Sequence, residues 1–278
     1  PTSDILPGVL PGGRVVVVSD ATIDRLYHPM LAPYDTVLIG LGESIKTLQT
    51  VESIYRRFIE LGVDRSTFVL GIGGGIVTDV AGFAAATYMI CDPGMLRTLS
   101  DREFRAGLAE VVKAAIIADA DLFARIEATT FDDLRSDTDL LTDAVSASIR
   151  VKADIVERDE RESGDRRKLN LGHTLAHAIE KCTNRLNHGE AVAVGTALIA
   201  DASVKLGVLT AEDRDRIAGV LKKLGFDLTP PVDVKRLLKE VGKDKKNEDG
   251  MLRIVVPIGI GDCDVRRMSH DEFAALFA

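Results

Sequence analysis

The stretch Arg166-Arg-Lys-Leu-Asn-Leu-Gly-His173-Thr-Leu-Ala-His177-Ala-Ile-Glu180 decides how the fold is organised. His173 and His177 are four residues apart, so a helix would place both imidazoles on one face, one turn apart. Asn187-His188-Gly-Glu190 follows after a short polar link and has the pattern of a second helix start. Two helix-borne imidazoles that converge on one point form a divalent metal site when a carboxylate joins them. The stretch therefore predicts a metal site between helices.

The alternative is that these histidines cap helices, or lie in the core with their rings bonded to the backbone. That is the usual role of a single histidine. Here three of the five histidines in the chain cluster beside Arg166 and Arg167. Because clustered titratable groups are typical of functional sites, we prefer the metal site.

Composition restricts the class of protein. A chain of 278 residues that is 46% apolar can bury one large core or two smaller ones. The net charge of −8 and the lack of a long basic block argue against a nucleic-acid surface. The three cysteines are widely spaced and form no CxxC motif, which argues against a disulfide framework or structural zinc.

The chain shows no membrane or export signal that we recognise. No charged segment followed by an apolar run opens the sequence, so we expect no signal peptide. The longest apolar run, Val80 to Cys91, is too short to span a bilayer. We therefore expect a soluble, cytoplasmic protein with no membrane partner and no nucleic-acid partner.

The first third of the chain alternates between two patterns. Residues 14–18, 35–39 and 66–70 are short, mostly apolar runs typical of buried strands. Between the second and third runs, apolar residues from 45 to 61 recur at helical spacing. Strands that alternate with helices predict an α/β domain with a parallel sheet.

A glycine-rich segment, Gly71-Ile-Gly-Gly-Gly75-Ile-Val-Thr-Asp79, follows the third predicted strand. Glycines between a strand and a helix let the backbone approach a phosphate, and the helix N-terminus favours its charge. Ile76 occupies the sixth position of the GxGxxG fingerprint, so a simple tight turn is the alternative. Asp20 and Glu43 lie just after the first two strands, and sheet ligands bind beyond the carboxyl ends of strands. The three strand ends together predict a bound dinucleotide.

A candidate for the metal carboxylate lies in the middle of the chain. Ser100-Asp-Arg-Glu103 is a capping-box pattern that opens a helix running to about residue 118. Glu110 and Lys113, three residues apart on that helix, are neighbours. A solvated ion pair is the usual explanation of such a pair, but apolar residues surround it, which indicates a helix buried on several sides. Glu110 is therefore our candidate for the third ligand.

The remaining segments predict a mainly helical second half. Residues 119–165 have the pattern of acidic helices, and further helices are expected at 191–209, 211–224 and 234–241. Residues 251–258 read as a strand. The cluster Lys243-Asp-Lys-Lys246 precedes this strand. Lysine clusters of this kind are more often solvated than functional.

At this point the chain resembles the 3-dehydroquinate synthase family. The matching segments, in family order, are Gly73–Met89, Leu99–Lys113, Glu160–Gly164, Leu169–Ala178 and His188–Val192. The glycine segment and the His-Gly-Glu segment are shared with metal-dependent polyol dehydrogenases. Ala109-Glu-Val-Val-Lys113 and the block from Glu160 to the histidines are more specific.

The resemblance implies a fold and an activity. It implies an N-terminal α/β NAD-binding domain with a parallel sheet, residues 1–98, and a mainly α-helical metal- and substrate-binding domain, residues 99–278. It further implies a homodimer that uses catalytic NAD and a divalent metal, zinc or cobalt. The implied reaction cyclises 3-deoxy-D-arabino-heptulosonate 7-phosphate to 3-dehydroquinate with loss of phosphate. This reaction is a step of the shikimate pathway to aromatic amino acids. The alternatives are another sugar-phosphate cyclase, an NAD-dependent polyol dehydrogenase, or a non-catalytic relic that binds the cofactor.

The resemblance also implies roles for individual residues. The metal ligands would be Glu110, His173 and His188. The catalytic residues would be Lys113, Glu162 and His177, and the sugar phosphate would be held by Lys152, Arg166, Asn170 and Lys246. The NAD contacts would be Asp20, Glu43, Lys46, Gly74, Gly75, Asp79 and Thr98.

One departure from the family pattern lies at Met89 and Ile90. After Tyr88-Met89 the family continues with an arginine, a strand, a Pro-Thr-Thr loop and a glycine-lysine segment, none of which occurs here. Either a segment between Met89 and Ile90 is missing from the sequence, or the chain carries a true deletion and is expected to be inactive. Bonded Cα atoms lie about 3.8 Å apart, so a much larger Met89–Ile90 separation would favour the missing segment.

Overall fold

The structure, a computed structural model, describes residues 10, 12–84, 93–159, 164–243 and 251–278. The Met89–Ile90 junction lies outside these residues. Contacts divide the chain into two compact units, Pro1–Asp92 and Pro93–Ala278. The boundary expected from the sequence follows residue 98, whereas the 3₁₀ helix η2 (Pro93–Thr98) groups with the second unit. One reason is that the Arg135 guanidinium donates to the carbonyls of Leu96 (3.0 Å) and Leu99 (2.5 Å).

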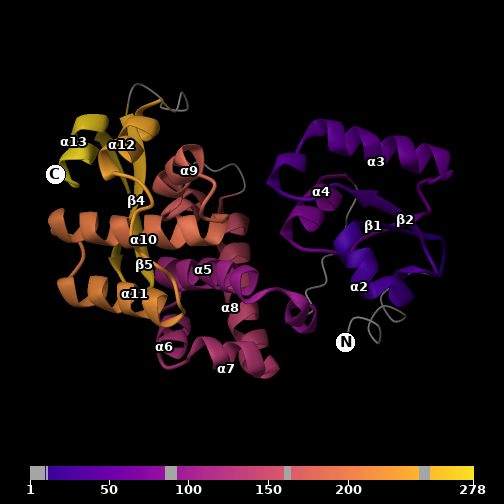
Figure 1. Cartoon of the computed structure of the whole chain (residues 1–278), viewed down its shortest axis with the longest axis horizontal. Helices are drawn as coiled ribbons and strands as arrows, with labels where there is room; N and C mark the ends of the chain where they lie inside the picture. The colour runs from indigo at the N-terminus through magenta and orange to yellow at the C-terminus, as the bar shows by residue number, and fades with distance from the viewer. Residues whose placement is uncertain (1–9, 11, 85–92, 160–163, 244–250) are drawn as a thin grey trace. The chain divides into compact units, whose positions relative to one another are not determined.

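The first unit is built on a parallel sheet of three strands in the order β2-β1-β3 (Figure 1). Its elements are β1 (Val15–Asp20), α2 (Ala21–Leu31), β2 (Asp35–Ile39), η1 (Glu43–Ile45), α3 (Leu48–Glu60), β3 (Phe68–Gly71) and α4 (Gly75–Ala84). Every residue of β1 is buried, because it is the central strand and is covered on both faces. The predicted strands and the predicted parallel sheet are confirmed.

The second unit is mainly helical, as predicted. After η2 it contains α5 (Asp101–Ala118), α6 (Ala120–Glu127), α7 (Phe131–Ser136), α8 (Thr138–Arg158), η3 (Asp165–Asn170), α9 (His173–Cys182), α10 (His188–Lys205), α11 (Ala211–Lys223) and α12 (Val234–Gly242). The antiparallel hairpin β4 (Met251–Gly259) and β5 (Asp262–Ser269) precedes α13 (His270–Ala275). Neither β5 nor α13 was expected from the sequence. No helix within the described residues is long and apolar enough to cross a membrane.

Helices α5 and α10 form the centre of the second unit, and glycines let their backbones touch. A Cβ on Gly189, in the first turn of α10, would lie 2.2 Å from the carbonyl oxygen of Ala106 on α5. A Cβ on Gly195 would lie 2.3 Å from the carbonyl oxygen of Gly172, which precedes α9. Since no side chain fits at either position, α10 is held directly against both α5 and the start of α9.

We expect Gly189→Ala to lower the free energy of unfolding by about 1–3 kcal/mol, because the added methyl group overlaps the Ala106 backbone. Gly219, inside α11, is the matched control, since nothing lies within 4 Å of its Cβ position. There, alanine should raise stability by about 0.5–1 kcal/mol through its better helix propensity. Chemical denaturation of both variants checks this. A Gly189→Ala protein as stable as Gly219→Ala would contradict the close contact.

Candidate metal centre

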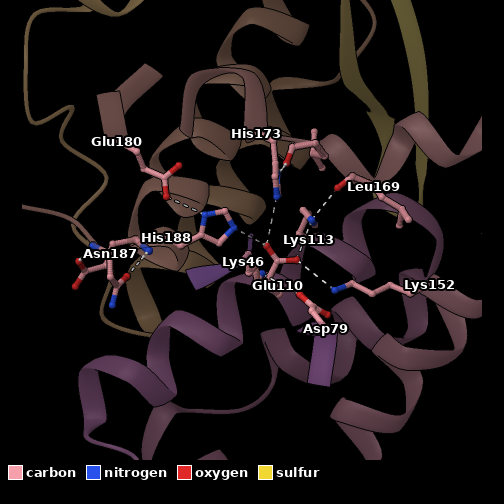
Figure 2. A network of polar contacts seen from close by, with 12 residues as sticks. Lys46, Asp79, Glu110, Lys113, Lys152, Leu169, His173, Glu180, Asn187 and His188 are labelled. Carbon is pink, nitrogen blue, oxygen red and sulfur yellow. Dashed lines mark hydrogen bonds and ion pairs between the residues drawn. The ribbon is translucent and has the colours of Figure 1, made fainter. Parts of the chain in front are cut away.

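Three side chains with metal-ligand chemistry converge in the second unit, each from a different helix. Glu110 lies in the middle of α5, His173 is the first residue of α9 and His188 is the first residue of α10. One ligand atom from each lies within 4.8 Å of the others. Glu110 Oε1 is 3.7 Å from His173 Nε2 and 3.8 Å from His188 Nε2 (Figure 2). These separations exceed hydrogen-bond distance and match atoms that share a cation.

The two oxygens of Glu110 have different surroundings. Oε2 is 2.8 Å from Lys113 Nζ and 3.5 Å from Lys152 Nζ. Oε1, which faces the two imidazoles, is buried and has no hydrogen-bond partner among the described residues. A buried carboxylate oxygen without a partner is costly, and a bound cation would satisfy it. A carboxylate with two imidazoles is also a common donor set for catalytic zinc, so these residues fit a divalent metal.

Both imidazoles are held with Nε2 toward Glu110. His173 Nδ1 lies 3.1 Å from the carbonyl oxygen of Leu171, and His188 Nδ1 lies 3.0 Å from Glu180 Oε1. A carbonyl and an ionised carboxylate only accept hydrogen bonds, so each Nδ1 carries the proton. Each Nε2 therefore presents its lone pair, as a metal ligand must.

The charges around the site set the protonation states that a metal requires. Burial alone would raise the pKa of Glu110, but the ammonium groups of Lys113 and Lys152 outweigh it and bring the pKa to about 2. Burial, reinforced by the charge of Lys113, lowers the pKa of His173 to about 4. At neutral pH the carboxylate is ionised and the imidazole is neutral, which are the forms that bind metals.

The start of α10, and with it the backbone of His188, is fixed by a network of polar contacts. Asn187 and Glu190 form a capping box, in which the side chain of each accepts from the backbone N–H of the other at 2.9 Å. Arg102 of α5 donates to both Glu190 oxygens, at 2.8 and 2.6 Å, and to the Arg185 carbonyl at 2.8 Å. This bidentate pair ties the first turn of α10 to the helix that carries Glu110.

The predicted catalytic and substrate residues that the structure describes in the second unit lie on α5, α8, η3 and α9. Lys113 is 3% exposed, and its Nζ donates to the Leu169 carbonyl at 2.7 Å as well as contacting Glu110. Lys152, on α8, is exposed. His177, on α9, is exposed, and its ring centroid is 5.6 Å from that of His173.

Arg166 and Asn170 both lie on η3, which follows α8. The buried carboxylate of Asp159 holds the start of this turn, because its Oδ2 accepts from the backbone N–H of Gly164 (2.7 Å) and of Arg166 (3.0 Å). Glu162 and Lys246, assigned to catalysis and substrate binding by resemblance, lie outside the described residues.

Thr98 ends η2, and its hydroxyl donates to the Met95 carbonyl at 2.9 Å. In the first unit, Asp20 ends β1 and caps α2, with Oδ1 accepting from the N–H groups of Thr22 (2.7 Å) and Ile23 (3.0 Å). Its predicted contact with NAD would thus involve a carboxylate that already stabilises a helix start. The side chain of Glu43 is not among the described ones.

The glycine segment between β3 and α4 contains two pairs of glycines with different surroundings. A Cβ on Gly71 or Gly73 would overlap Ala81 or Val77, so these two glycines allow close packing. Nothing lies within 4 Å of a Cβ on Gly74 or on Gly75, and Gly75 begins α4. An open, exposed backbone at a helix N-terminus is the arrangement that receives a phosphate, so the segment fits a dinucleotide.

Lys46 and Asp79 form an ion pair, with Nζ 2.9 Å from Oδ2. Both residues come from the first unit, Lys46 just after η1 and Asp79 within α4. Their predicted contacts with NAD stay predictions.

Some residues that shape the site were not identified from the sequence. Glu180 contacts His188, and Arg102 contacts Glu190. Both residues lie in stretches that the sequence singled out, but neither received a role at the site from the sequence. Glu180 nevertheless carried a signal, since it lies seven residues after His173 and hence two turns along the same helix face.

The chain is similar to known proteins over most of its length. Residues 36–91 match the 3-dehydroquinate synthase N-terminal family model, and residues 107–247 match the C-terminal one. The chain is 37% identical to the 3-dehydroquinate synthase of Halorhodospira halophila, covering 94% of this chain and 88% of the relative. It is 33% identical to that of Pelobacter propionicus, covering 95% and 89%. The first alignment spans 312 residues, more than this chain contains, so the relative holds residues without a counterpart here.

Two solved structures share the fold. 2-epi-5-epi-valiolone synthase from Streptomyces hygroscopicus, with NAD⁺ and Zn²⁺ bound, superposes with a TM-score of 0.81 at 25% identity, covering 95% of this chain and 89% of that one. A 2-deoxy-scyllo-inosose synthase complexed with carbaglucose-6-phosphate, NAD⁺ and Co²⁺ gives 0.82 at 20% identity, covering 99% and 94%. The predicted fold class is thus confirmed.

We expect His188→Ala to abolish zinc retention while leaving the fold intact, because the ring is 51% exposed and packs little core. His177→Ala is the matched control, since His177 lies outside the set of converging ligand atoms. Elemental analysis after dialysis against zinc checks this. Equal zinc in the His188→Ala and parent proteins would contradict the ligand set.

The metal-free protein should lose stability as the pH falls from 6.5 to 4. His173 is buried near Lys113, Glu110 and His188, and its pKa of about 4 lies below the ordinary 6.5, so the unfolded chain binds the proton first. The free energy of unfolding should fall by up to about 3 kcal/mol over that window. Urea unfolding at several pH values should show a smaller fall for His173→Gln. Parallel curves for the two proteins would contradict the buried, neutral imidazole.

Proposed function

This chain belongs to the 3-dehydroquinate synthase family, and on that premise we propose that it converts 3-deoxy-D-arabino-heptulosonate 7-phosphate to 3-dehydroquinate and phosphate. The observation that carries the proposal is the convergence of Glu110, His173 and His188 beside Lys113. Such a site suits a substrate that combines adjacent hydroxyls with negative charge.

The metal would be held by those three side chains and the dinucleotide by the open glycines of the first unit. When bound, the metal supplies Lewis acidity to adjacent substrate hydroxyls, and NAD supplies a hydride acceptor that later returns the hydride. The protein provides the anionic and neutral ligand forms, because Glu110 is ionised and His173 is neutral at working pH.

The cations of the second unit would offset the charge of the substrate. Lys113 is buried and bonded to Glu110 and to the Leu169 carbonyl, so its ammonium group is fixed in place. Lys152 is exposed, and Arg166 lies on η3, whose first turn Asp159 holds. On a chain of net charge −8 these cations, together with Asn170 as a neutral donor, favour a carboxylate and phosphate ligand locally.

Proton transfer would fall to His177 and Glu162. The exposed ring of His177 lies one turn beyond His173 on α9, close enough to serve a substrate bound at the metal centre. An imidazole both accepts and donates protons near neutral pH, which elimination of phosphate and ring closure both require.

A second candidate is another sugar-phosphate cyclase, because two structures of that kind superpose with TM-scores of 0.81 and 0.82. The higher identity to 3-dehydroquinate synthases, 37% against 25% and 20%, favours the first candidate. An NAD-dependent polyol dehydrogenase has less support, since a probable glycerol dehydrogenase from Sinorhizobium meliloti gives a TM-score of 0.56 at 14% identity. We also propose a cytoplasmic homodimer, by precedent of the family.

Assay of the protein with NAD, zinc and the heptulosonate phosphate tests the proposal. We expect phosphate release without NADH accumulation at 340 nm, because the hydride is returned in each cycle. His188→Ala should release phosphate at least about 100-fold more slowly. Steady NADH formation from a polyol would instead identify a dehydrogenase, and NAD binding without turnover of the sugar phosphate would identify a relic.

A further inference from the structure

We propose that Glu180 is a positioning residue, which holds the imidazole of His188 with Nε2 toward Glu110 and thereby sets the affinity for zinc. This inference rests on the proposed metal centre and adds to it a residue outside the ligand set. Glu180 is not itself a ligand, and it acts through its contact with the ring of His188.

The imidazole of His188 lies between two carboxylates (Figure 2). Its Nδ1 is 3.0 Å from Glu180 Oε1, a hydrogen bond, and its Nε2 is 3.8 Å from Glu110 Oε1. Glu180 comes from α9, two turns after His173 on the same helix face. One helix therefore supplies one ligand directly and contacts the ring of the next ligand.

The two histidines are held in different ways. His173 is 15% exposed, and its Nδ1 partner is the backbone carbonyl of Leu171, which cannot turn away. His188 is 51% exposed, so packing restrains its ring far less. A side-chain hydrogen bond therefore restrains the ring orientation of His188 more than that of His173.

The polar contacts that cap α10 do not fix the orientation of the His188 ring. Asn187, Glu190 and Arg102 fix the backbone at the start of α10, but the ring of His188 still rotates about two side-chain bonds. The hydrogen bond from Nδ1 to Glu180 selects one orientation. It also selects the tautomer, because an ionised carboxylate only accepts, which leaves the lone pair on Nε2.

Removal of such an outer carboxylate typically weakens metal binding about 10–100-fold. We therefore expect Glu180→Ala to raise the zinc Kd by about that factor in the full chain. Glu180→Gln should have a smaller effect, because its amide oxygen still accepts from Nδ1. Glu212 is an exposed glutamate in the first turn of α11. The Glu212→Gln variant is the matched control and should bind zinc as the parent does.

The experiment measures zinc affinity of metal-stripped protein by competition with a chromogenic chelator. Far-UV circular dichroism and thermal unfolding of the stripped variants separate a positioning effect from a loss of fold. Visible absorption of the cobalt-substituted proteins gives a second readout, since a misoriented imidazole changes the ligand field.

Unchanged zinc affinity in both Glu180 variants would overturn the role of Glu180 and leave the metal centre intact. An equal loss in Glu212→Gln would overturn it as well, because it would reveal a general effect of charge. Failure of the parent to bind zinc, or parent-like binding by His188→Ala, would overturn the metal centre itself and this inference with it. The two failures are therefore distinguishable.

Discussion

The close contact between α5 and α10 is the constraint on which the site depends. Gly189 touches the Ala106 backbone, one turn before Glu110, and Gly195 touches the carbonyl of Gly172, which immediately precedes His173. Glycine inside a helix lowers stability by about 1 kcal/mol relative to alanine, so its use here indicates that a short backbone approach matters more than propensity. The approach brings three ligands from three helices to one point. The glycines thus place the site without taking part in its chemistry.

The charges around this point favour both a bound metal cation and a bound anionic substrate. Lys113 and Lys152 keep Glu110 ionised although it is largely buried, and burial beside Lys113 keeps His173 neutral. The same two lysines give the neighbourhood the positive charge that a phosphorylated, carboxylated substrate requires. One set of contacts therefore accounts for both the proposed metal binding and the proposed choice of substrate.

Much of this arrangement could be predicted from the sequence, because it depends on local pattern. The spacing of His173 and His177 indicated a helix face, the apolar neighbours of Glu110 indicated a buried carboxylate, and Asn187 indicated a helix start. The role of Glu180 could not be predicted, since it depends on how the α9–α10 connection turns one helix against the next. β5 was missed because its exposed residues include charged arginines, so the apolar signal is weak. Asp20, predicted at a strand end to bind a cofactor, caps α2, and its contact with a cofactor stays a prediction.

The proposed activity requires that Glu110, His173 and His188 hold a single divalent cation. X-ray absorption at the zinc edge of the zinc-loaded protein tests it most directly. We expect two imidazole nitrogens at about 2.0–2.1 Å together with oxygen, and no sulfur. A spectrum with fewer than two imidazoles, or with a zinc–sulfur distance near 2.3 Å, would contradict it.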